Sequence, residues 1–96
     1  MATDQDVSIS LGELDAETDV IVNNRNAEYG VSVNLVISGS LTVSILLSYD
    51  NGSSWDTLQT TYTSSNDFVV DIPGGAWMKL KATAYSSGSA TGSMVM

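Results

Sequence analysis

The sequence predicts a single all-β domain spanning residues 1–96, an antiparallel β-sandwich of immunoglobulin-like or jelly-roll-like type, with a small barrel as the second choice. Three observations support this prediction. Ser and Thr make up 24 of the 96 residues, whereas the polar helix formers Glu, Lys, Arg and Gln are scarce. Apolar and polar residues alternate with a period of two in several segments. Turn-forming residues separate these segments about every ten residues.

The clearest alternation lies in residues 31–38, where the odd positions are apolar and most even positions are polar. Residues 41–49 repeat the pattern, and Ser38-Gly39-Ser40 between them is expected to form a tight hairpin connection. About eight short strands are expected in total. The others are placed at residues 7–11, 20–22, 57–63, 68–72, 77–85 and 94–96.

Turns are expected where residues that tolerate positive φ or fix a turn gather. They are placed at Asn23-Asn24, Asp50-Asn51-Gly52, residues 64–67, Pro73-Gly74-Gly75 and Ser86-Ser87-Gly88. Residues 11–17 contain a glycine and are too few to nucleate a helix, so a loop or single turn is expected there. The inward-facing positions predict the core. Its expected members are Val33, Leu35, Ile37, Val43, Ile45, Leu47, Phe68, Val70, Met78 and Leu80.

Composition excludes several classes of function. Eleven acidic residues against three basic ones give a net charge of −8, which repels nucleic acid and anionic membranes. The chain has no Cys or His, so disulfides, thiolate chemistry and histidine catalysis are absent. No apolar run is long enough for a membrane-spanning helix. The acidic start of the chain does not match a secretion signal, so synthesis in a cytoplasm is expected, with residues 1–6 as a flexible arm.

The sharpest local motif is the segment Ser48-Tyr49-Asp50-Asn51-Gly52-Ser53-Ser54-Trp55. It resembles the Asp-box, a hairpin motif of sialidases and many unrelated β-proteins, at Ser48, Asp50, Gly52 and Trp55. Asp50 is expected to accept backbone N–H bonds, Gly52 to supply positive φ, and Trp55 to fold over the hairpin. Sialidases bind a substrate carboxylate with an arginine cluster, whereas this chain has one arginine, Arg25. A structural role is therefore expected.

Two other uses of acidic residues remain open at this point. Asp50, Asn51 and Asp56 offer oxygen ligands for calcium within seven residues, although the EF-hand order is not met. Acid pairs that a glycosidase would need occur at Asp4/Asp6, Glu13/Asp15/Glu17 and Asp67/Asp71, but acids in turns are ordinarily solvated. With no nucleophile beside an identifiable base, we expect no catalysis, no cofactor and no bound metal.

A second candidate site combines an aromatic residue with two of the three basic residues. Trp77, Lys79 and Lys81 share the strand face opposite Met78 and Leu80. This patch is a possible docking surface for an acidic partner. The alternative is that Trp77 shields the adjacent turn while the lysines discourage edge-to-edge pairing of strands.

The segment from residue 41 to residue 96 resembles small structural proteins of tailed bacteriophages. In that group a hairpin with D-x-G-x-x-W precedes an apolar strand, a Pro-Gly turn and a strand ending near a Gly/Ser-rich C-terminus. Here these parts are Asp50–Trp55, residues 68–72, Pro73-Gly74-Gly75 and residues 77–85. The resemblance implies a virion component, such as a capsid decoration or cement protein, that needs no cofactor.

The same resemblance implies a partner, the major capsid protein of the phage shell, and a homo-oligomer in which a trimer is favoured. The expected place of action is the virion, after synthesis in the host cytoplasm. Two alternatives are kept: a carbohydrate-binding module, which would need two or more coplanar exposed aromatic residues, and a tail or fibre domain of the same kind of particle. Neither nucleic acid nor a membrane is expected as a partner.

Overall fold

The computed structural model describes residues 6–96, which form strands, turns and loops and contain no helix. Every strand pair is antiparallel and the sheet is open, so the all-β prediction is confirmed and the closed barrel is not observed. Six strands are present. They are β1 (Asp6–Leu11), β2 (Ile21–Val22), β3 (Tyr29–Ser48), β4 (Asp56–Tyr62), β5 (Asn66–Ile72) and β6 (Trp77–Val95).

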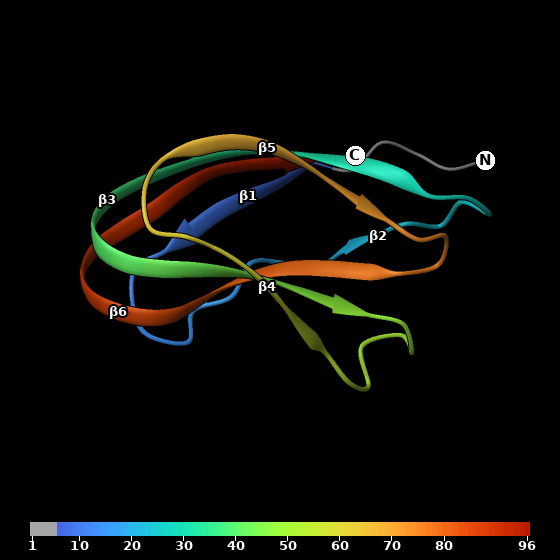
Figure 1. Cartoon of the computed structure of the whole chain (residues 1–96), viewed down its shortest axis with the longest axis horizontal. Coiled ribbons are helices and arrows are strands. Elements are labelled where there is room, and N and C mark those ends of the chain that lie inside the picture. Colours follow the sequence, from blue (N-terminus) through green and yellow to red (C-terminus); the bar gives the residue numbers. More distant parts are fainter. Residues whose placement is uncertain (1–5) are drawn as a thin grey trace.

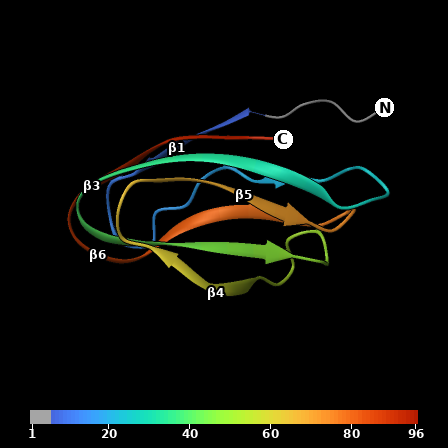
Figure 2. The same ribbon diagram turned by 45° about the horizontal axis from the view of Figure 1, so that its top comes forward.

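The two long strands, β3 and β6, pair with each other along almost their whole length and bend together, as the left side of Figure 1 shows. The bend folds one hydrogen-bonded sheet into two layers, which Figure 2 shows one above the other. The first layer has the order β1, β6, β3, β5 and uses the end of β6 and the start of β3. The second layer has the order β2, β6, β3, β4 and uses their other halves.

Two glycines lie opposite each other at the bend. Gly39 has φ 105° and pairs with Gly88, which has φ 87°. A Cβ on Gly88 would lie 1.7 Å from the carbonyl oxygen of Ser38, so only glycine fits there. Two register shifts follow at once, between Ser40 and Leu41 and between Thr42 and Val43. Such irregularities increase the local bending of a strand.

The expected hairpin between residues 31–38 and 41–49 is therefore wrong, because Ser38-Gly39-Ser40 lies inside β3. The turn expected at Ser86-Ser87-Gly88 is also wrong, since these residues lie inside β6. At both places the glycine lets the strand bend into the other layer while its hydrogen-bonded ladder continues. For this reason the eight expected short strands are six strands, two of them long.

The hydrophobic core lies between the two layers and receives the inward side chains of both. Of the ten predicted core residues, all but Ile37, Phe68 and Val70 are buried, and these three pack against the core while partly exposed. Phe68 of β5 stacks on Tyr62 of β4, with ring centroids 4.1 Å apart and planes 6° apart. This stacked pair joins the two layers at one side of the sandwich.

At one end of the sandwich, the fully buried Asn23 holds two loops together. Its amide nitrogen donates to the carbonyl oxygens of Ile72 and Pro73 at 3.0 Å and of Ala27 at 3.1 Å. Its side-chain oxygen accepts from the backbone N–H of Arg25 at 3.1 Å. The predicted turns at residues 23–24 and 73–75 are thus joined through one side chain.

Most of the arm expected at residues 1–6 lies outside the described residues, and Asp6 already belongs to β1, opposite Val95. The turn expected within residues 11–17 is present, with Asp15 at φ 65°. Residues 6–96 contain no helix of the length and apolar character that crossing a membrane requires.

Candidate functional site

The loop between β3 and β4 carries the Asp-box-like motif and is closed by side-chain hydrogen bonds. Asp50 accepts the backbone N–H of Ser54 at 2.9 Å and the Ser54 hydroxyl at 2.6 Å. The fully buried Ser48 donates its hydroxyl to Asp50 at 2.8 Å and accepts the N–H of Gly52 at 2.8 Å. Asn51 and Gly52 both have positive φ, 58° and 84°. The spacing of the motif thus matches a self-contained turn.

These hydrogen bonds also set the charge of the loop. The Ser54 hydroxyl, the Ser54 N–H and the Ser48 hydroxyl all favour the carboxylate and lower the pKa of Asp50 from 3.8 to about 2. Asp50 is therefore ionised across the physiological pH range. Since both its oxygens already accept hydrogen bonds within the loop, the carboxylate acts first as a cap for this turn.

Trp55, which ends the motif, meets the second predicted site. The ammonium of Lys79 lies 4.2 Å from the centroid of the Trp55 ring, a cation–π distance. Lys79 comes from β6 and Trp55 precedes β4, while β3 runs between these two strands. The two side chains therefore meet across β3, and Leu46, which pairs with Lys79 on that strand, is only 6% exposed.

Both lysines of the predicted patch are engaged by acids of the segment that precedes β2. The ammonium of Lys79 lies 3.0 Å from a Glu17 oxygen. That of Lys81 lies 3.7 Å from Asp15 and 4.0 Å from Glu17. Backbone bonds hold this segment beside β6, including that from the Asp15 N–H to the Ala82 oxygen at 2.9 Å. The positive charges of the patch are thus balanced within the chain.

The sequence-predicted residues therefore form one cluster on the outer face of the second layer. Trp77 adjoins the loop, because a Cβ on Gly52 would lie 2.8 Å from the Trp77 ring. We call this group of residues the tryptophan cluster; its members are Asp15, Glu17, Gly52, Trp55, Trp77, Lys79 and Lys81. Its contacts are internal to the fold. Whether Trp77, Lys79 and Lys81 also touch a partner stays a prediction.

The acids weighed as catalytic or metal-binding residues are spread over the fold. Asp15 and Glu17 pair with lysines, whereas Asp67 and Asp71 lie on the outward side of β5. Within residues 6–96 no three acidic, histidine or cysteine side chains gather closely enough to hold a metal ion. For the possible calcium site at Asp50, Asn51 and Asp56, residues 6–96 therefore supply no cluster of acidic ligands.

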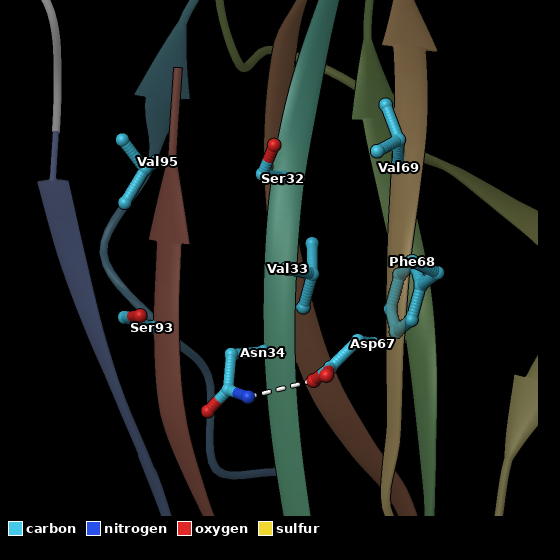
Figure 3. Close-up of a pocket in the computed structure, with 8 residues that line it drawn as sticks. All are labelled: Ser32, Val33, Asn34, Asp67, Phe68, Val69, Ser93 and Val95. Carbon is cyan, nitrogen blue, oxygen red and sulfur yellow. Dashed lines mark hydrogen bonds between the residues drawn. The ribbon is translucent and has the colours of Figure 1, made fainter.

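The outer face of the first layer carries a groove that sequence reasoning missed (Figure 3). Its volume is about 460 Å³, and it runs along β3 between β6 and β5. Ser32 lies between Val95 and Val69, to which it is paired on either side. Asn34 lies between Ser93 and Asp67 in the next outward row, and its amide donates to Asp67 at 2.6 Å.

The walls of this groove carry exposed apolar side chains. Val69 is 63% exposed and Val95 is 42% exposed, and Val36 on the same face of β3 is 47% exposed. In the sequence, these valines occupy outward positions of strands with alternating apolar and polar residues, and this is the only feature that could have indicated the groove. Their common neighbourhood depends on the order β6-β3-β5, which strand patterns alone do not give.

The two outer faces also differ in charge. The segments that build the first layer contain Asp6, Asp67 and Asp71 at outward, exposed positions and no Lys, Arg or His. The lysines belong to the second layer, and Arg25 lies 3.8 Å above the ring of Tyr29. The groove therefore combines apolar side chains with the carboxylate of Asp67, and the strands that form it contribute no cation.

Comparison with known proteins adds no relative: no family model matches the chain, and no curated protein matches it significantly.

Proposed function

We propose that this chain is a non-enzymatic structural protein of a bacteriophage virion, a capsid decoration or cement protein that binds the major capsid shell and stabilises it. Two kinds of evidence support the proposal. The first is the resemblance of residues 41–96 to small structural proteins of tailed phages. The second is the presence of one outer face suited to covering another protein. In this role the protein uses no cofactor, and a homotrimer is the favoured unit on the shell.

The contrast between the two outer faces is the observation that carries the proposal. On the second layer, the Lys79 ammonium lies against the Trp55 ring, and ion pairs join Lys79 and Lys81 to the neighbouring segment. On the first layer, Val36, Val69 and Val95 remain exposed among serines and threonines. A sheet face with exposed apolar side chains is typical of a protein interaction surface.

Co-sedimentation tests the proposal directly. Purified protein is mixed with empty heads of the phage whose genome carries its gene, and the heads are pelleted and then heated. We expect the protein to pellet in many copies per head and to raise the temperature at which the heads release their contents. Heads that neither bind the protein nor gain heat resistance would refute the proposal. Retention on a polysaccharide column in that case would favour the carbohydrate-binding alternative.

A further inference from the structure

We propose that the groove on the first layer binds an extended segment of a partner protein in which basic and apolar residues alternate. The proposal deepens the function above and rests on it, because the partner would be the shell protein. It goes beyond that function because it names the binding surface and the chemistry of the bound segment.

The floor of the groove is formed by Ser32 and Asn34 on β3, and Gly30 continues this outward row beyond the groove. A Cβ on Gly30 would lie 3.0 Å from a Val69 methyl and 3.2 Å from an Asp71 oxygen, so both β5 side chains lean toward this row of β3. On the other side, Val95 and Ser93 of β6 form the opposite wall, as Figure 3 shows. Such a floor lets a partner's backbone approach closely.

The wall on β5 has the spacing of an extended chain. Asp67 and Val69 line the groove, and Asp71 follows at the next outward position just beyond it, so the three recur at every second position of β5. Side chains on one face of an extended partner recur about every 7 Å, which is the same interval. A partner segment with a basic residue, an apolar residue and a basic residue at alternate positions therefore matches a carboxylate, a methyl group and a carboxylate.

Charge decides between a partner protein and a second copy of this chain. The groove offers carboxylates and needs cations, but this chain has only three basic residues. Lys79 and Lys81 are paired with acids of their own chain, and Arg25 stacks on Tyr29. A second copy would bring further negative charge to a negative surface. The complementary occupant is thus a different, basic protein segment.

The probe for this inference is a nine-residue peptide, Lys-Thr-Val-Thr-Lys-Thr-Val-Thr-Lys, capped at both ends. Its control has glutamate in place of every lysine. Each is titrated into ¹⁵N-labelled full-length protein, and amide chemical shifts are followed by NMR. We expect the lysine peptide to shift the amides of Ser32, Asn34 and Val69, and to leave the tryptophan cluster unchanged. Raising the salt concentration from about 50 to about 500 mM should weaken binding severalfold.

Two variants distinguish peptide binding in the groove from nonspecific attraction to an acidic protein. Replacing both wall acids in an Asp67→Asn/Asp71→Asn protein should weaken peptide binding about fivefold or more, since two exposed charge pairs are lost. The matched control, Asp19→Asn/Asp56→Asn, removes the same charge from exposed positions elsewhere. We expect it to bind the peptide within about twofold of the native protein. The thermal midpoint and the amide spectrum check that each variant is folded.

A third variant tests the shape of the groove. Ser32→Tyr places a ring on the exposed floor without changing charge, and we expect it to abolish the peptide shifts. Equal binding of the glutamate peptide, shifts mainly at the tryptophan cluster, or unchanged binding by the wall variant would overturn the inference. If groove variants still bind phage heads normally, the inference fails while the proposed function stands. If the native protein ignores heads but holds the peptide in the groove, the reverse is true.

Discussion

The bend at the paired glycines makes a strong prediction about stability, because the whole two-layer arrangement depends on it. Replacing Gly88 by Ala places a Cβ 1.7 Å from the Ser38 carbonyl oxygen and 2.7 Å from the Gly39 Cα. Both contacts are with backbone, so no side-chain rotation relieves them. Gly88 also has φ 87°, a conformation that alanine adopts only at a cost.

The expected loss follows from these two effects. Positive φ costs alanine about 1–2 kcal/mol, and shifting the backbone of Ser38 and Gly39 to accommodate the extra carbon costs about 1–3 kcal/mol more. The sum, about 2–5 kcal/mol, is a large part of the stability of a domain of this size. It corresponds to a fall of at least about 10 °C in the melting temperature. Urea unfolding followed by tryptophan fluorescence measures the free energy, and a thermal scan by circular dichroism measures the midpoint.

The matched control is Gly12→Ala, at an exposed position where a Cβ meets nothing within 4 Å. Its effect on the free energy of unfolding should stay within about 1 kcal/mol, in either direction. If the Gly88 variant also lost less than about 1 kcal/mol, the continuous bent strands would not require glycine there. The reasoning about the bend would then be wrong.

Two further predictions concern loops at the end of the sandwich away from the bend. Asn23→Ala removes four hydrogen bonds from a buried site and should lower the free energy of unfolding, measured with urea, by about 2–4 kcal/mol. The control Asn24→Ala, at an exposed position, should lower it by less than about 0.5 kcal/mol. Equal losses would exclude the proposed role of Asn23. Asp50→Asn should destabilise the protein at neutral pH. The pKa of Asp50 in the folded protein is lowered to about 2, so the difference in unfolding free energy between variant and native protein should shrink as the pH falls from about 4 through about 2. A difference independent of pH would contradict that origin.

Much of the fold is readable from the sequence because alternation reports which side of a strand is buried. Val33, Leu35, Val43 and Ile45 are buried as their period-two pattern predicts. The pattern cannot tell a turn from a bend. Gly39 and its serine neighbours suit a hairpin turn equally well, and only the opposing Gly88 on a strand about fifty residues away identifies a bend.

In the candidate sites too, contacts within a short segment could be predicted from the sequence, whereas contacts between distant segments could not. The hydrogen bonds around Asp50 are local and follow from residue spacing. The contact of Trp55 with Lys79 joins two segments that were treated as separate sites, and it depends on strand order. The groove depends on strand order as well, since Val69 and Val95 flank Ser32 only because β5 and β6 both pair with β3.

Cryo-electron microscopy of phage heads decorated with the protein tests the central claim most directly. The account predicts added density on the outside of the shell into which the chain fits, with the groove between Val69 and Val95 turned toward the capsid protein. It also predicts an extended shell segment lying in that groove. Heads without added density, or a chain bound through Trp77 with the groove facing solvent, would contradict the account.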